Sequence, residues 1–215
     1  MRQTSQSLQA TFTAIFQANG WGDAESVSGP GSTESRGDDF RQELVALLDA
    51  WQVRSIVDAP CGDFNWMRHV LADRLLPPPL SYTGIDIVED LIARNAHRHA
   101  SASCRFLCAD ITRADLPRGD LIICRDALVH LPFADALAAI DNFRRSGSRY
   151  LLSTTFVGRA SNEDALAGEW RPLNLQADPF RFPTPLALVD ERCTHTGGIY
   201  RDKHLGLWEL ASIEP

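Results

Sequence analysis

Ile56-Val-Asp-Ala-Pro-Cys-Gly-Asp-Phe64 is the stretch of this chain that decides its fold. It reads as a short apolar strand that ends in an acid and a tight turn, and a helical segment begins near Asn65. In a doubly wound α/β sheet the ligand lies outside the carboxyl ends of the strands, where a small residue lets the backbone approach it. Gly62 is that small residue, so we expect a ligand site at this turn.

Further strand-like runs follow along the chain, and the segments between the first and second and between the fourth and fifth read as helices. Runs of Ile, Val and Leu without polar alternation are typical of a parallel sheet covered on both faces. The sequence therefore predicts an α/β fold with a doubly wound, mostly parallel sheet. The expected strands are Ser55 to Ala59, Tyr82 to Ile87, Arg105 to Ala109, Leu121 to Cys124 and Arg149 to Thr155.

The first part of the chain, residues 1–37, is rich in Ser, Gly, Thr and Gln. Its aromatic cluster ends at Trp21 and precedes a glycine-broken run, which predicts a short helix and then a loop, either an N-terminal lid or a tail. After a pair of Asp caps that starts at Asp38, apolar residues recur at helical spacing as far as Trp51. We therefore expect the sheet domain to span residues 38–215.

The last part of the chain changes character after the fifth strand. A Pro- and Trp-bearing stretch without a clear period predicts an irregular insert at about 157–185. Beyond it, Leu186 to His195 and Leu205 to Leu210 could pair as a hairpin across two glycines. We expect this antiparallel C-terminal strand pair at the edge of the sheet.

Acidic residues end the first three strands. Asp86 follows the glycine turn by about twenty residues, the spacing at which an acid accepts hydrogen bonds from ribose hydroxyls. Asp110 could reach an adenine amino group, or it could serve merely as a turn acid. Asp58 could contact the ligand, or it could merely cap the turn that follows it. Because the carboxyl ends of parallel strands share one edge, we expect the three carboxylates to converge there.

Arg125, Asp126 and His130 follow the fourth strand. Two charges directly after an apolar strand are costly unless they are satisfied at the ligand edge, although they could also pair with each other. His130 could be a core-facing histidine or a base. We interpret the three as catalytic candidates, with Asp126 or His130 as the group that takes a proton from the acceptor.

In order and spacing, these four elements resemble motifs I to IV of class I, Rossmann-like S-adenosylmethionine-dependent methyltransferases. The resemblance covers about residues 38–156, and the final hairpin is similar to the strand pair that closes the sheet of that family. It implies S-adenosyl-L-methionine as the cofactor. Implied cofactor contacts are Asp58, Ala59, Pro60, Cys61 and Gly62 for the methionine part, Asp86 and Ile87 for the ribose and adenine, and Asp110 and Ile111 for the adenine.

Further candidates come from outside these motifs. In methyltransferases that act on small molecules, a segment before the sheet often closes over the cofactor, and small hydroxyl residues there could hold its carboxylate. Trp21, Ser28 and Ser32, together with Arg125, complete the candidate cofactor set. The candidate acceptor-binding residues are Trp66, Trp170, Arg171 and Asn174. The last three have an alternative role, which is merely to pack the insert.

The glycine turn departs from the usual pattern of this family, in which motif I carries three glycines. Pro60 and Phe64 stand where the first and third glycines would be. Pro60 fixes its own φ and restricts the preceding residue, which stiffens the turn. The loss also disfavours a nicotinamide or flavin reductase, because a pyrophosphate needs close backbone approach at more than one glycine.

Composition sets further limits. With 215 residues and 44% apolar content the chain can bury one large core, and a formal net charge of -7 disfavours a general nucleic-acid binder. No stretch approaches the ~20 apolar residues that span a bilayer, so we expect a cytoplasmic protein with no membrane partner. Its five cysteines mostly lie in apolar runs, as expected of reduced, buried thiols. They offer no convincing metal site.

These observations predict a methyltransferase that transfers a methyl group to an oxygen or nitrogen atom of a small molecule or glycan. The oligomeric state stays open. One alternative is a non-catalytic module that binds S-adenosylmethionine, and another is an enzyme that cleaves or cyclises it.

Overall fold

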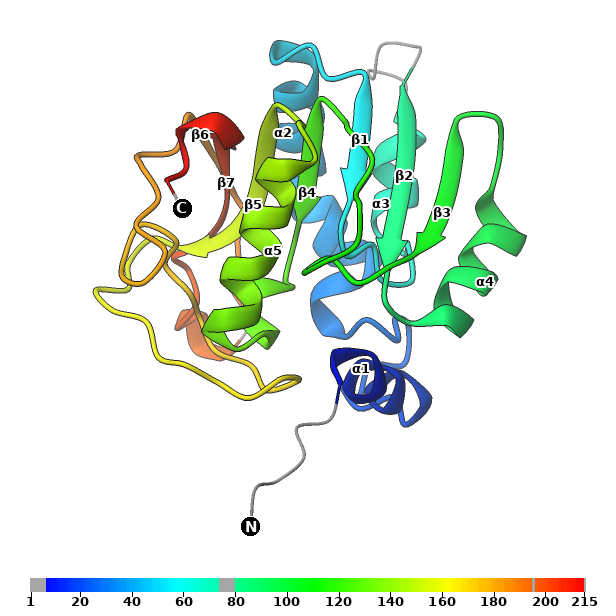
Figure 1. The fold of residues 1–215 in the computed structure, drawn as a ribbon, viewed down its shortest axis with the longest axis horizontal. Helices are drawn as coiled ribbons and strands as arrows, with labels where there is room; N and C mark the ends of the chain where they lie inside the picture. Colours follow the sequence, from blue (N-terminus) through cyan, green and yellow to red (C-terminus); the bar gives the residue numbers. More distant parts are fainter. Residues whose placement is uncertain (1–6, 74–79, 195, 215) are drawn as a thin grey trace.

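The computed structural model describes residues 7–73, 80–194 and 196–214. Its centre is a seven-stranded sheet in the order β3-β2-β1-β4-β5-β7-β6, in which β1 to β5 run parallel and β7 is antiparallel to both β5 and β6 (Figure 1). This confirms the predicted fold and its antiparallel strand pair. The strands are β1 Ser55–Asp58, β2 Ser81–Asp86, β3 Cys104–Cys108, β4 Leu121–Cys124, β5 Tyr150–Phe156, β6 Ala187–Asp190 and β7 Lys203–Glu209.

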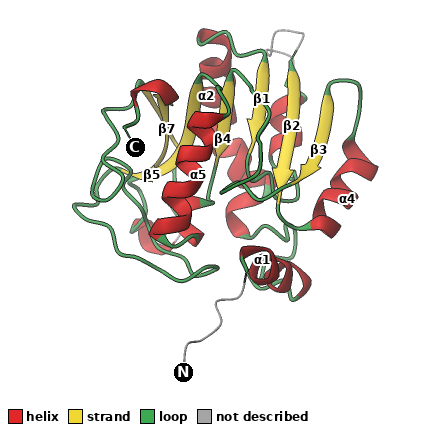
Figure 2. Ribbon diagram, in the orientation of Figure 1, coloured by secondary structure: helices red, strands yellow, loops and turns green. Residues whose placement is uncertain are grey.

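Helices cover both faces of the sheet (Figure 2). Helix α5 packs on one face through Ala136, Ala139, Ile140 and Phe143, which recur at the spacing of one helical face. Helices α2 and α3 pack on the other face. The helices of the described residues are α1 Leu8–Gln17, α2 Glu34–Ala50, α3 Met67–Leu71, α4 Glu89–His99 and α5 Phe133–Arg145.

The central strands explain why two hydrophobic layers form. Successive side chains of a strand point to opposite faces, so Ile122 packs toward α5 while Ile123 packs toward α2 and α3. Every residue of β4 and of β5 is buried. Continuous apolar runs therefore mark the middle of the sheet, as the sequence predicted.

Helix α2 begins earlier than expected. The prediction placed its caps at Asp38, but the helix starts at Glu34 and Thr33 is its N-cap residue. Gly37 lies inside the helix, and a larger residue does not fit there because its Cβ would come within 2.9 Å of the Cβ of Trp66. The close approach of two backbones selected this glycine, and the expected domain start at residue 38 falls within a helix. Helix α3 begins at Met67, shortly after the expected start near Asn65.

The cysteines depart in part from the expectation of buried thiols. Cys61, Cys124 and Cys193 are buried, but Cys108 is exposed and Cys104 is half-buried. Both of these lie on β3, the edge strand of the sheet, where only one neighbour covers the chain. The expectation was therefore wrong for Cys108. Among the described helices, none has the length and apolar character needed to cross a bilayer.

The N-terminal segment with α1 and the insert after β5 both lie at the carboxyl ends of the parallel strands. The strand arrows of β1 and β2 point toward α1, and the chain after β5 loops past the same end of the sheet (Figure 1). Between Phe156 and Ala187 the described chain contains no helix or strand, in agreement with the expected insert at 157–185.

Candidate functional site

A cavity of about 490 Å³ opens at the carboxyl ends of the strands, within the size range of small-molecule sites. Its floor is formed by the ends of β1, β2 and β4, and the segment before α2 covers it. The strand-end acids Asp58, Asp86 and Asp110 all line this cavity, together with Gly62. The edge predicted from the sequence thus encloses a single pocket.

The turn after β1 is shaped by Gly62, which has a φ of +54°. Its amide donates a hydrogen bond to Oδ2 of Asp86 at 3.1 Å, which ties the turn to the end of β2. A Cβ on Gly62 would come within 2.4 Å of Oγ of Ser28, and that hydroxyl accepts a hydrogen bond from the amide of Asp63 at 2.8 Å. Only glycine leaves room for this contact between turn and N-terminal segment.

Phe64, in place of the third glycine, has a packing role. Its ring lies 5.0 Å from that of Tyr82 and 5.2 Å from those of His99 and Phe106, measured between ring centroids. The side chain is buried and does not line the cavity. Phe64 therefore fills the core beneath the turn and does not reach the cavity.

Two buried carboxylates face the cavity from neighbouring strands. Asp58 accepts a hydrogen bond from the hydroxyl of Tyr82 at 2.7 Å, and burial raises its pKa to about 7. Asp86 accepts from the amides of Gly62 and Val88, and burial raises its pKa to about 6. Carboxylates with raised pKa values in a pocket gain from a ligand that brings hydrogen-bond donors or positive charge.

Asp110 serves as a turn acid while it lines the cavity. Its Oδ1 accepts hydrogen bonds from the amide and the hydroxyl of Thr112 at 3.0 and 2.7 Å. Its Oδ2 pairs with Nε of the exposed Arg113 at 3.0 Å. The turn role is therefore observed, and contact with an adenine stays a prediction. Apolar Ile87 and Ile111 lie along the same part of the cavity.

Beyond β4 the cavity wall contains a network of four charges. Arg125 pairs with Glu191 at 2.6 Å, and Lys203 contacts both Glu191 at 3.0 Å and Asp126 at 2.6 Å. Although burial alone would raise the pKa of Asp126, Lys203 and Arg125 hold this pKa well below its usual range. Asp126 therefore stays ionised and is a weak base.

Sequence reasoning missed Glu191 and Lys203. Glu191 directly follows β6 and Lys203 is the first residue of β7, so a charge next to an apolar run was the only signal in the sequence. Arg125 also donates from Nη1 to the carbonyl of Gly31 at 2.8 Å, and its guanidinium lies 5.0 Å from the ring centres of Phe40 and Trp66. This side chain thus joins β4 to the N-terminal segment.

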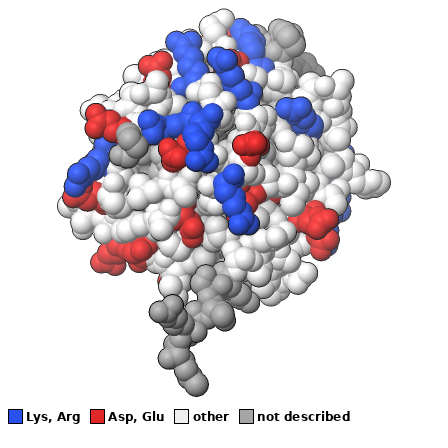
Figure 3. Space-filling model, viewed as in Figure 1, with Lys and Arg blue, Asp and Glu red and all other residues white. Residues whose placement is uncertain are grey.

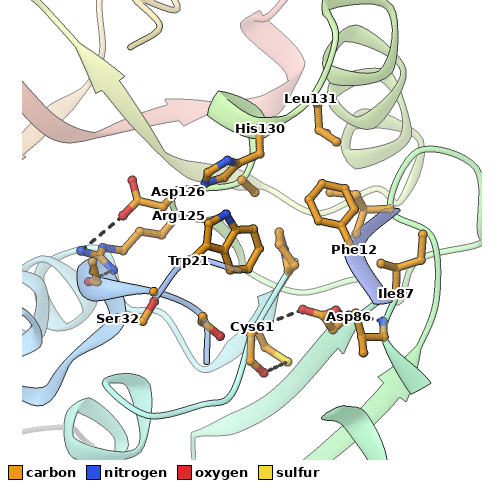
Figure 4. A pocket seen from close by; sticks show the side chains of 18 of the residues that line it. Phe12, Trp21, Ser32, Cys61, Asp86, Ile87, Arg125, Asp126, His130 and Leu131 are labelled. Atoms are coloured by element: carbon orange, nitrogen blue, oxygen red, sulfur yellow. Dashed lines mark hydrogen bonds and ion pairs between the residues drawn. The ribbon is translucent and has the colours of Figure 1, made fainter. Parts of the chain in front are cut away.

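His130 presents one ring nitrogen as an acceptor. Its Nδ1 lies 3.0 Å from the carbonyl oxygen of Glu169, and since a carbonyl can only accept, Nδ1 carries the hydrogen and Nε2 keeps its lone pair. Burial lowers the pKa of His130, which keeps the ring neutral. Figure 4 shows its ring beside that of Trp21, with Arg125 and Asp126 to one side and Phe12 and Ile87 to the other. The two ring centres are 5.1 Å apart.

The N-terminal segment is hydrogen-bonded to the turn after β1. The hydroxyl of Ser26 donates to the carboxylate of Asp63 at 2.8 Å, and Nδ2 of the Asn65 side chain donates to the carbonyl of Ser32 at 3.1 Å. Trp21, Ser28 and Ser32 line the cavity, and so do Phe12 and Phe16 of α1, which the sequence did not single out as site residues.

Not all candidate residues reach the cavity. Trp66 and Trp170 line it, but Arg171, Asn174 and Ala59 do not. Arg171 donates hydrogen bonds to the carbonyls of Leu128 and Leu131, and Asn174 donates to the carbonyl of Arg159 at 2.8 Å. Arg171 thus ties the insert to the segment after β4, and Asn174 makes its bond within the insert. The remaining candidates Pro60 and Cys61 line the cavity beside Gly62.

Comparisons with known proteins agree with this architecture. Residues 56–147 match a family model described as a methyltransferase domain. Human N-acetylserotonin methyltransferase in complex with SAM is 13% identical, with a TM-score of 0.57 over 94% of this chain and 59% of that chain. The N-methyltransferase NodS from Bradyrhizobium japonicum WM9, in complex with S-adenosylhomocysteine, is 16% identical, with a TM-score of 0.53 over 68% of this chain and 74% of that one.

The same fold occurs in the [4+2]-cyclase SpnF, which is 17% identical, with a TM-score of 0.52 over 82% of this chain and 72% of that one. The chain spans 66% of the length of another solved structure, the methyltransferase domain of bacterial CtHen1. Among proteins with curated annotation, none matches the chain in sequence. The resemblance to class I methyltransferases is thus confirmed in the fold and in the central segment.

Proposed function

We propose that this chain, whose fold and central segment are those of a class I methyltransferase, uses S-adenosyl-L-methionine to methylate an oxygen or nitrogen atom of a small molecule or glycan. The observation that carries the proposal is the convergence of Asp58, Gly62, Asp86 and Asp110 on one cavity at the carboxyl ends of the strands. This edge is where the fold places its ligands.

The residues present fit this cofactor. Asp86 would accept hydrogen bonds from the ribose hydroxyls, and apolar Ile87 and Ile111 would contact the adenine, beside Asp110. The buried carboxylate of Asp58 suits a ligand that carries positive charge. Ser28 and Ser32 offer hydroxyl groups next to the glycine turn, where the amino acid end of the ligand would lie.

The cofactor would supply an electrophilic methyl group, and the chain would supply position and a base. Holding the acceptor in line with that group in a closed cavity is worth several kcal/mol in general. Nε2 of His130 would take the proton of the acceptor. Asp126, as an ion-paired carboxylate, would position Lys203 and the end of β4. Arg125 would fix the N-terminal segment over the cavity.

The surface supports a small acceptor. On the face shown in Figure 3, basic and acidic side chains are interspersed among uncharged ones. With a net charge of -7, this distribution does not favour a long nucleic-acid backbone.

Two alternatives share the same cofactor site. A non-catalytic module would need no base, so the neutral His130 in the cavity argues against it. An enzyme that cleaves or cyclises S-adenosylmethionine would use the same cofactor site, and the [4+2]-cyclase SpnF shows that this fold also occurs in an enzyme that is not named as a methyltransferase. Identification of the products separates it from a methyltransferase.

Asp86→Ala should weaken binding of S-adenosylmethionine by about 10- to 100-fold, because a charge-assisted hydrogen bond to a hydroxyl is worth about 1.5 to 3 kcal/mol and water returns part of it. Calorimetric titration of the folded variant measures the change. Asp90→Ala, an exposed acid four residues along on α4, is the matched control and should bind normally. Wild-type affinity in Asp86→Ala would show that β2 does not hold the ribose.

Cofactor binding should strengthen as the pH rises from 5 to 8. In the free protein the raised pKa values of Asp86, about 6, and Asp58, about 7, leave both carboxyls protonated at low pH. A ligand with hydroxyl donors and positive charge prefers the ionised forms, so affinity at pH 5 should be lower by at least about tenfold. Titrations in two buffers of different ionisation enthalpy should also detect proton release near pH 6.5. A pH-independent affinity would contradict this role.

We further propose that residues 7–33 act as a lid and not as a tail. The segment lines the cavity through Trp21 and Ser28, and it is anchored by the bond from Arg125 to the carbonyl of Gly31. Loops that close over a ligand exclude water and complete the site.

A further inference from the structure

Past β4 the cavity continues along the ends of β5 and β7, and its wall there is aromatic. Phe156 is the last residue of β5, Trp170 comes from the insert and Tyr200 precedes β7. Each ring packs edge-on against the other two, with ring centres 4.9 Å apart for Trp170 and Tyr200 and 6.0 Å apart for the other two pairs. Segments that are distant in sequence thus build one wall.

This wall is open to solvent at one point. Trp170 is 42% exposed although it lines the cavity, so a ligand can reach this part of the wall from solvent. Trp21 and His130 add two more rings within the same cavity.

Polar groups are few in this part of the cavity. Asp126 and Lys203 are paired with each other at 2.6 Å, Arg171 donates to carbonyls of the segment after β4, and Asn174 donates to a carbonyl within the insert. A sugar carries a hydroxyl on most ring carbons, and each buried hydroxyl without a partner costs about 1 to 3 kcal/mol. The wall therefore suits a flat acceptor with few polar atoms better than a glycan.

Resting on the methyltransferase function proposed above, we propose that the acceptor is a small hydroxylated aromatic compound that lies against Trp170 and Tyr200, with its hydroxyl toward His130. During transfer the phenolic oxygen gives its proton to Nε2 of His130 and forms the new bond to the methyl carbon. The bond from that carbon to sulfur breaks, and its electron pair stays on sulfur, which becomes neutral. The cofactor would occupy the remaining part of the same cavity, so the acceptor must be small.

The test uses 2-naphthol, its saturated counterpart decahydro-2-naphthol, and methyl α-D-glucopyranoside as probes. Each is titrated into the full chain saturated with S-adenosylhomocysteine. We expect 2-naphthol to bind at least about threefold more tightly than decahydro-2-naphthol, because aromatic pairs are worth about 0.5 to 1.5 kcal/mol beyond area burial. The glucoside should show no binding, and mass spectrometry should detect methylated 2-naphthol with S-adenosylmethionine.

Variants assign the binding to the wall. Trp170→Ala and Tyr200→Ala should each weaken 2-naphthol binding by at least about fivefold, while affinity for S-adenosylhomocysteine changes by less than about threefold. Trp51→Ala, whose indole packs against Tyr150 at the opposite ends of the strands, is the control and should change neither. Binding of the glucoside but not of 2-naphthol, or unchanged affinity in both wall variants, would overturn the inference. Failure to bind S-adenosylhomocysteine would instead remove the proposed function, and the inference with it.

Discussion

His130→Ala is expected to lower the rate of methyl transfer by at least about 100-fold while affinity for S-adenosylmethionine stays within about threefold. Nε2 of this ring has a lone pair because Nδ1 is bound to the carbonyl of Glu169. The side chain lies beside Trp21, away from the carboxylates that would hold the cofactor. Binding and chemistry should therefore separate in this variant.

The pH profile gives an independent check on His130. Because burial lowers the pKa of His130 below its ordinary value of about 6.5, the neutral base is present at neutral pH and is lost only as the pH falls through the lowered value. The rate under saturating cofactor should be level above pH 7 and fall in acid, and the variant should lack this fall.

The measurement uses whichever probe compound the wild-type chain methylates. His97→Ala, an exposed histidine on α4, is the matched control and should keep full activity. A variant of His130 that loses cofactor affinity in proportion to rate would place this residue in the cofactor site. Catalysis would then rest on positioning alone.

Deletion of residues 1–33 should weaken cofactor binding by at least about 100-fold and abolish turnover. The deletion removes the covering side chains Phe12, Trp21 and Ser28, and it leaves α2 intact because that helix starts at Glu34. It also removes the carbonyl of Gly31, which accepts a hydrogen bond from Arg125. Without the lid, water reaches the site and the amino acid end of the cofactor loses its contacts.

The sheet domain should survive this deletion. The two large hydrophobic clusters consist of buried residues from Phe40 onward, and α1 contributes only partly buried side chains to one of them. Circular dichroism and thermal unfolding would establish that the shortened chain is folded. If that folded chain binds S-adenosylmethionine as the full chain does, the segment is a tail and not a lid.

The sequence predicted the strands well because continuous apolar runs and glycine turns are local signals. It located the cavity through Asp58, Gly62 and Asp86, whose meeting follows from parallel strands sharing an edge. The start of α2 was misjudged because Gly37 is required by a contact with Trp66, a residue far along the chain. Local propensity carries no information about such a contact.

The charge network shows the same limit. Arg125 and Asp126 stood out after β4, but their partners Glu191 and Lys203 lie more than sixty residues away and become neighbours only through the antiparallel strand pair. Conversely, Arg171 seemed suited to bind an acceptor, yet its guanidinium is occupied by the backbone carbonyls of Leu128 and Leu131, in the segment after β4. Side-chain chemistry suggested roles that only the packing could assign.

The most direct test of the account is calorimetric titration of the full chain with S-adenosylmethionine and S-adenosylhomocysteine. The account predicts saturable binding of both, with dissociation constants from about one micromolar to some tens of micromolar. No heat with either ligand, alongside saturable binding of NADH, would contradict it and would favour a reductase at the same edge of the sheet.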